Sequence, residues 1–153
     1  HLVVSTLHTN SAASTITRLT DMGIEPYLIA DATIGVIAQR LVRRLCPECK
    51  RAKKADQEEL EMLMLEPDAD VTVYEPCGCP KCDGTGFRGR IGVYEIMELT
   101  QSLKSIISKN GSAEEIKEKA LEEGMHTLRM SATGYVLKGI TSVQEMMRVS
   151  FDL

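Results

Sequence analysis

The sequence predicts an α/β protein, and three observations along the chain lead to this fold class. A short apolar stretch with β-branched residues, 2–4, is followed by a polar turn and then by apolar residues at helical spacing. This order of strand, turn and helix is the repeating unit of α/β sheets. Residues 91–99 alternate in polarity and favour another strand. Beyond residue 100, helix-capping patterns alternate with glycines, which is typical of consecutive helices.

The first helix is expected to begin near Ala12. Asn10 or Ser11 suits its N-cap, and Gly23 stands where its C-terminal cap belongs. The strand before it, residues 2–4, is entirely apolar and is therefore expected to be buried on both faces of a parallel sheet. Ligands of such sheets bind beyond the carboxyl ends of the strands, which is where the polar turn lies.

The elements that follow are predicted from local signals. Pro26 suits the first turn of a second helix. Residues 34–44 fit a strand or a helix, and we favour a strand through Val36 and Ile37. Later helix starts are marked by three capping patterns, namely Asp56 with Glu59, Ser112 with Glu115, and Ser142 with Glu145.

Charged residues are grouped into two blocks of opposite sign. Seven basic residues and one acid lie between residues 40 and 54, whereas residues 55–70 contain seven acids and no base. Such blocks are usually solvated faces. The alternative is a docking surface for an acidic partner or for lipid headgroups.

Composition excludes several classes of protein. The net charge of −4 and the scarcity of aromatic residues argue against a general nucleic-acid binder. No apolar run approaches the ~20 residues of a membrane span, and no signal-peptide pattern is present. Five cysteines, an odd number without secretory features, argue against a disulfide framework. We therefore expect a cytoplasmic protein.

The cysteines form two copies of one short motif. Cys46-Pro-Glu-Cys49 and Cys79-Pro-Lys-Cys82 are separated by 29 residues. Two such pairs supply four sulfurs, which suits a tetrahedral zinc ion with Zn–S distances of about 2.3 Å. Because four protein ligands leave no open position, the ion is expected to be structural.

Two other interpretations of these motifs remain open. A lone Cys-Pro-x-Cys can be a redox dithiol, although that usually requires a thioredoxin-like context, and two copies argue against it. Iron in a tetrahedral sulfur site is also compatible with the sequence. The fifth thiol, Cys77, is left outside the ligand set because of its spacing.

Four stretches together resemble the secretion ATPases that drive type II secretion and type IV pilus assembly. HLVVSTLHTNSAASTITRLTDMG resembles the histidine box and following helix of that family. AQRLVRRLCPEC and GCPKCDGTGFRGRIGVYEIMEL resemble the two sides of the four-cysteine zinc module of its assembly-type branch. GITSVQEMMRV resembles its helical C-terminal end. The resemblance extends over essentially the whole chain.

This resemblance implies the C-terminal part of a RecA-like P-loop ATPase domain with an inserted zinc module and a helical C-terminal subdomain. It divides the chain into a core portion, 1–45, a zinc module, 46–90, and a strand with helices, 91–153. It also implies a homo-hexamer in the parent protein, peripheral to the inner membrane through secretion or pilus platform proteins. ATP and magnesium would be cofactors of that parent.

The chain departs from the family at the nucleotide site. No Gly-Lys-Ser/Thr phosphate loop occurs in it, and no acidic strand end stands out as the magnesium-holding site. In the family both precede the histidine box. We therefore expect the C-terminal portion of a larger ATPase, inactive by itself.

The second histidine of the box approaches the ATP γ-phosphate in the family, which implies that role for His8. An imidazole can donate a hydrogen bond to a phosphate oxygen, and the helix N-terminus that follows is expected to add a favourable dipole. Thr6 and Asn10 are candidates for supporting hydrogen bonds, and Arg18 for a contact with the phosphate or a neighbour. An ordinary structural histidine and a surface arginine are the alternatives.

Two further alternatives concern function. The chain is also compatible with a non-catalytic zinc-binding interaction module. CDGTG after CPKC resembles the repeat of J-domain co-chaperones, but only one copy is complete here. Arg88 and Arg90 either serve solubility or bridge the zinc module to the ATPase core or to an adjacent subunit.

Overall fold

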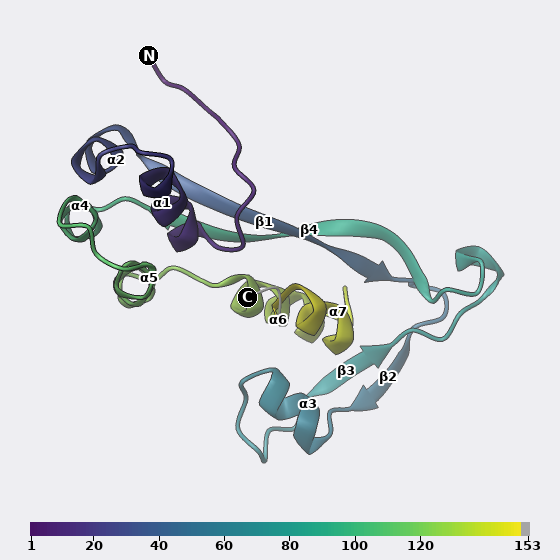
Figure 1. The fold of residues 1–153 in the computed structure, drawn as a ribbon. Helices are drawn as coiled ribbons and strands as arrows, with labels where there is room; N and C mark the ends of the chain where they lie inside the picture. Colours follow the sequence, from purple (N-terminus) through teal and green to yellow (C-terminus); the bar gives the residue numbers. More distant parts are fainter. Residues whose placement is uncertain (151–153) are drawn as a thin grey trace. The chain divides into compact units, whose positions relative to one another are not determined.

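The computed structural model of the chain describes residues 1–150, which form two compact units. Unit 1 comprises residues 1–38 and 94–127, and unit 2 comprises residues 39–93 and those from 128 onward (Figure 1). Each unit has its own apolar core, made only of its own residues. The domain boundaries at residues 46 and 91 remain a prediction.

Unit 1 is built mainly of helices. They are α1 (Ala12–Asp21), α2 (Pro26–Ala32), α4 (Gln101–Ser108) and α5 (Ala113–Glu122). Their apolar faces share one core in which Ile16, Leu103 and Ile116 are almost fully buried. The predicted starts at Ser11, at Pro26 and at the Ser112–Glu115 capping box are confirmed.

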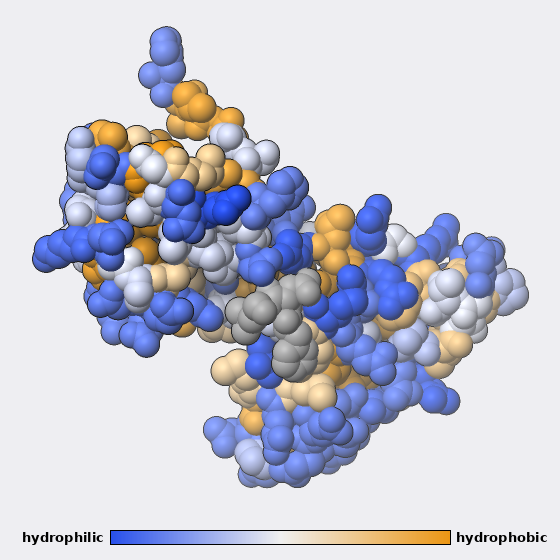
Figure 2. Space-filling model, viewed as in Figure 1, coloured by the Kyte–Doolittle hydropathy of each residue, from blue (hydrophilic) through white to orange (hydrophobic). Residues whose placement is uncertain are grey.

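The strand expected at residues 2–4 is not formed. Leu2, Val3 and Val4 are 80%, 78% and 88% exposed, and the chain up to Thr9 has no regular secondary structure. The apolar side chains of this segment stand free at the surface in Figure 2. The physical reason is that a strand needs a neighbouring strand for its backbone hydrogen bonds, and none of the described residues supplies one.

A two-stranded sheet consists of β1 (Gly35–Leu45) and β4 (Phe87–Glu98). The strands predicted through Val36 and Ile37, within residues 34–44, and at residues 91–99 are therefore confirmed, although β4 begins earlier than expected. Alternate residues of β4 are buried, so that Val93, Glu95 and Met97 share its inner face. A glutamate on this face is unusual, because a buried carboxylate needs hydrogen-bond partners.

Unit 2 contains the cysteines. Its elements other than parts of β1 and β4 are β2 (Arg51–Lys54), α3 (Gln57–Met62), β3 (Thr72–Glu75), the 3-10 turn η1 (Pro80–Cys82), α6 (Leu128–Leu137) and α7 (Val143–Ser150). Helix α3 begins at the predicted Asp56–Glu59 capping box. Leu60 and Val73 pack in one core with Val136 and Met146 of the last two helices.

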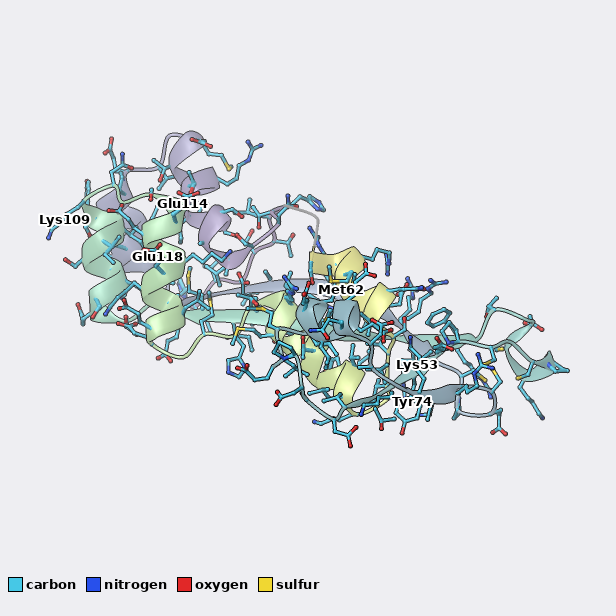
Figure 3. All side chains as sticks on the ribbon, turned by 90° about the horizontal axis from the view of Figure 1, so that it is seen from below. Lys53, Met62, Tyr74, Lys109, Glu114 and Glu118 are labelled. Carbon is cyan, nitrogen blue, oxygen red and sulfur yellow. The ribbon has the colours of Figure 1, made fainter. Side chains whose placement is uncertain are left out.

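The antiparallel pair β2–β3 explains how cysteine motifs 29 residues apart in the sequence meet. Its register pairs Arg51 with Glu75 and Lys54 with Thr72, so the chain leaves and returns at the same end. Cys49 lies just before this pair, and the second motif follows it. Lys53 and Tyr74, labelled in Figure 3, lie on the two neighbouring strands.

Basic side chains of the 40–54 block form ion pairs within unit 2, both with the acidic block at residues 55–70 and with Glu75 beyond it. Lys53 Nζ lies 2.9 Å from a Glu59 oxygen and 3.4 Å from a Glu75 oxygen. Arg51 pairs with Glu75 at 3.1 Å, and Lys54 with Asp70 at 3.1 Å. Exposed pairs of this kind contribute only about 0–1 kcal/mol each. Their presence favours the solvated-face interpretation over a docking surface for this part of the basic block.

Buried Glu145 connects α7 to β1. Its side chain is 2% exposed and accepts hydrogen bonds from the Arg43 backbone N–H at 2.8 Å and from the Arg43 guanidinium at 2.7 and 3.0 Å. Arg148 adds a contact at 3.0 Å. Burial raises the pKa of Glu145, but the hydrogen bonds from Arg43 and then Arg148 outweigh it and lower the pKa to about 2.

Only one half of the capping box expected at the start of α7 is formed. The Ser142 hydroxyl accepts from the Glu145 N–H at 3.3 Å, as a cap should. The Glu145 carboxylate, however, binds Arg43, which gives it a tertiary role that a local pattern does not reveal.

Candidate functional site

The four paired cysteines converge on one point of unit 2. The Sγ atoms of Cys46, Cys49, Cys79 and Cys82 all lie within 4.8 Å of one another. The Cys46–Cys79 separation is 3.9 Å, and the Cys49–Cys82 and Cys79–Cys82 separations are 3.8 Å. A tetrahedron with Zn–S bonds of about 2.3 Å has sulfurs about 3.8 Å apart, whereas a disulfide would require about 2.05 Å. The residues therefore fit one tetrahedral metal ion.

Backbone N–H groups point at the sulfurs of this cluster. Gly78 donates to Cys49 Sγ at 3.3 Å, while Cys79 and Gly86 each donate to Cys82 Sγ at 3.2 Å. Such bonds stabilise thiolates, which are the metal-binding form of cysteine. The cluster thus has an inner set of sulfurs and a surrounding set of donors, as metal centres require.

These donors separate the pKa values of the thiols. Burial raises the pKa of Cys49 to about 12, with hydrogen bonds from neighbouring thiols adding to the rise and that from Gly78 opposing it. Burial also acts to raise the pKa of Cys82, but the N–H groups of Cys79 and Gly86 lower it to about 6. Burial also raises the pKa of Cys79. Binding of a metal ion would therefore displace protons from Cys49 and Cys79, because the thiolate is the form that binds metal.

Two glycines allow the second motif to close around the sulfurs. Gly78 and Gly86 have φ of +97° and +75°. A Cβ on Gly78 would lie 2.5 Å from the Gly84 oxygen, and one on Gly86 would lie 2.5 Å from the Pro76 Cβ. Only glycine combines this backbone conformation with so close an approach.

We expect Gly86→Ala to weaken the binding of added Zn²⁺ to the cysteine cluster by at least about tenfold, because left-handed strain and the clash with Pro76 together cost on the order of 1–3 kcal/mol. Competition with a chromophoric chelator measures the affinity. Gly89→Ala is the matched control, since Gly89 has φ of +76° but open space around it. Equal affinities for the two variants would refute the role given to close packing at Gly86.

Cys77 stands apart from the cluster. It is exposed and does not belong to the group of four, although it precedes Cys79 by only two residues. Its exclusion from the ligand set by spacing agrees with this placement.

The residues predicted to lie near nucleotide are at the surface of unit 1. Thr6 and His8 lie in the irregular segment before α1, Asn10 lies just before the helix, and Arg18 lies on its exposed side. Among residues 1–150, Thr6, His8 and Arg18 form no hydrogen bond or ion pair with one another. Their roles at a nucleotide site remain predictions.

The N-terminus of α1 is already occupied by groups of the protein. Glu95 Oε1 accepts from the Ala12 N–H at 2.7 Å, and Ser11 Oγ accepts from the Ser14 N–H at 3.2 Å. A buried carboxylate at this position opposes the binding of a phosphate there. The partial positive charge of this helix terminus, which was expected to favour a phosphate, therefore interacts with the Glu95 carboxylate instead.

Arg88 and Arg90 are exposed at the start of β4. Arg90 lines an open hollow of about 290 Å³ together with Arg43, Thr85, Phe87 and Gly89. The Arg43 guanidinium lies 4.0 Å from the centre of the Phe87 ring. A bridging role for Arg88 and Arg90 remains a prediction.

The chain matches the family model described as "Type II/IV secretion system protein" over residues 1–148. The chain therefore belongs to the type II/IV secretion system protein family. This membership takes precedence over the likeness of one motif to J-domain co-chaperones.

Three relatives of this family illustrate the match. The type II secretion system protein E of Pseudomonas aeruginosa is 45% identical over 98% of the chain and 30% of its own length. The type IV pilus assembly ATPase TfpB of Acinetobacter baylyi is 42% identical over 97% of the chain and 26% of its own length. The type IV pilus assembly ATPase PilB of Thermus thermophilus is 45% identical over 96% of the chain and 17% of its own length. The chain thus spans less than a third of the length of each of these family members.

Within residues 1–150, no helix combines the length and the apolar character needed to cross a bilayer.

Proposed function

We propose that this chain contributes the histidine segment before α1 (residues 1–9) and a structural zinc module to an ATPase that powers type II protein secretion or type IV pilus assembly. Its match to family members named as such ATPases supports the activity. The four sulfurs, spaced as a tetrahedral zinc site requires, carry the metal part of the proposal. In this proposal the ATPase core is RecA-like and would bind ATP with magnesium through a phosphate loop, a motif that these 153 residues do not contain.

The assembly in this proposal is a homo-hexamer in the cytoplasm. It associates with the inner membrane through secretion or pilus platform proteins, and it does not bind nucleic acid. The net charge of −4 and the two phenylalanines and four tyrosines support the last point.

Cys46, Cys49, Cys79 and Cys82 would hold the zinc ion. With four protein ligands the ion would supply a structural cross-link between the end of β1, the β2–β3 pair and the start of β4, and it would have no open position for a substrate. The chain's own residues then hold unit 2 together. Lys50 Nζ donates to the Gly139 carbonyl at 2.8 Å and lies 4.6 Å from the centre of the Tyr74 ring.

His8 is proposed to sense the γ-phosphate. Its exposure in the segment before α1 leaves the imidazole accessible to a nucleotide. Thr6 and Asn10 would support it, and Arg18 would contact the phosphate or a neighbouring subunit. The imidazole donates a hydrogen bond to a phosphate oxygen, and the presence of that contact reports the nucleotide state to α1.

His8→Ala in the complete gene product that contains these residues is expected to lower ATP turnover about a hundredfold, the range of a lost transition-state donor. Steady-state turnover and zinc content are measured together, and zinc content should not change. The matched control is His126→Ala, because His126 is exposed and lies outside the histidine segment. Turnover of His8→Ala equal to that of the control would remove the assignment.

The 153-residue chain alone is expected not to hydrolyse ATP, because it contains no Gly-x-x-x-x-Gly-Lys-Ser/Thr loop to hold the phosphates. A coupled phosphate-release assay on the purified chain measures this. Turnover that survives removal of contaminating ATPases would contradict the division of labour proposed here.

A further inference from the structure

Glu95 is a buried carboxylate that neither the metal centre nor the predicted nucleotide residues explain. It is 4% exposed and lies on the inner face of β4, with the apolar Met97 two residues away on the same face. Its Oε1 accepts from the Ala12 N–H, 83 residues distant in the sequence, at 2.7 Å. Burying a charge is costly unless strong partners compensate, so this contact must be a favourable one.

Helix α1 offers that compensation. It spans Ala12–Asp21 and has no acidic residue in its first turn, whereas α5 has Glu114 and Glu115 there. Its N-terminal partial positive charge is therefore neutralised by a carboxylate from β4. Ala12 is 0% exposed, so its N–H is closed to water and would otherwise lack a partner.

The residues before Ala12 are tied to the same helix turn. Thr9 Oγ1 lies 2.7 Å from Thr15 Oγ1, and the Thr15 hydroxyl donates to the Ser11 carbonyl at 3.1 Å. Ser11 also forms a capping box with Ser14. The chain is thus fixed from Thr9 to Ala12, and His8 is the last residue before this fixed point.

We propose that Glu95 is a positioning residue for His8. By holding the first N–H of α1 against β4, it fixes where the histidine segment joins the helix and so orients the imidazole toward the nucleotide. This inference rests on the proposed γ-phosphate role of His8. Glu95 does not touch the nucleotide itself.

The test uses variants of the complete gene product, with turnover, KM for ATP, zinc content and circular dichroism measured on each. Glu95→Ala should lower kcat at least about tenfold and change KM less than threefold, because a misplaced group costs mainly the chemical step. Glu95→Gln should retain most of the kcat, since an amide oxygen still accepts from Ala12. Glu98→Ala, an exposed glutamate on the same strand, is the matched control and should equal the parent.

A double-mutant cycle separates positioning from a merely structural role. If Glu95 acts through His8, Glu95→Ala should lower kcat less than about twofold further in a His8→Ala background. Should Glu95→Ala not fold, Glu95→Asp replaces it, because the shorter side chain keeps the charge but withdraws the oxygen from Ala12.

Full additivity of the two substitutions would overturn the positioning role while leaving the proposed function intact. Parent-like kcat in both Glu95→Ala and Glu95→Asp would overturn it as well. If His8→Ala alone has no effect, the proposed function fails first and the positioning role fails with it.

Discussion

Replacing Cys46 with serine is expected to abolish stoichiometric zinc binding and to unfold unit 2. Cys46 is fully buried, and its N–H donates to the Gly86 carbonyl at 2.9 Å. Structural zinc in small modules contributes roughly 10–16 kcal/mol of apparent free energy. A typical domain has a net stability of only about 5–15 kcal/mol. Loss of one ligand therefore removes an amount comparable to the whole stability of the unit.

Hydrogen exchange measured by mass spectrometry shows separately whether unit 1 and unit 2 remain folded in Cys46→Ser. Peptides from α3 and α7 should lose protection in Cys46→Ser, because these helices share the core of unit 2. Peptides from α5, whose core contains no residue of unit 2, should keep theirs. Cys77→Ser is the matched control, since its thiol is exposed and outside the cluster. Parent-like protection of α7 in Cys46→Ser would contradict a folding role for the metal.

Glu145→Ala is expected to destabilise unit 2 by about 1–3 kcal/mol, the range for leaving a hydrogen-bonded polar group without its partner, because the Arg43 side chain that remains is 51% exposed and can be hydrated. The substitution leaves the Arg43 N–H and guanidinium without their acceptor and removes the link between β1 and α7. Urea unfolding followed by circular dichroism measures the change. Gln144→Ala, an exposed neighbour on the same helix, should cost less than about 0.5 kcal/mol.

The same residue predicts a pH dependence. Because the folded-state pKa of Glu145 is about 2, below its ordinary value of 4.5, its contribution is fully present above pH 4.5 and is lost as pH falls toward 2. Glu145→Gln has no charge to titrate and should show a shallower loss of stability across this window. Identical stability curves for the parent and Glu145→Gln between pH 2 and 5 would contradict the depressed pKa.

Local signals in the sequence correctly predicted the helix starts, because these depend on interactions within one helical turn. Ser11 and Pro26 mark helix starts because a side-chain cap or a fixed φ acts within one turn. The spacing of Cys46, Cys49, Cys79 and Cys82 predicted one four-sulfur cluster, and the structure brings these sulfurs together. A strand depends on its neighbours, so the apolar stretch at residues 2–4 gave a wrong prediction.

The long-range contacts were beyond the reach of local patterns. Glu145 fits a capping box with Ser142, so nothing nearby in the sequence points to Arg43. Glu95 lies in a strand of alternating polarity, and no local pattern in the sequence predicts that it contacts Ala12 of α1. The glycines around the second cysteine motif were a usable signal, since Gly78 and Gly86 flank the sulfurs that they support, but their role in closing the loop required the backbone conformation.

X-ray absorption at the zinc and iron edges, performed on the purified chain kept under reductant, tests the central claim most directly. One zinc per chain with four sulfur neighbours at about 2.3 Å is the predicted result. Iron in place of zinc, nitrogen or oxygen atoms in the coordination shell, or no stoichiometric metal at all would contradict the account.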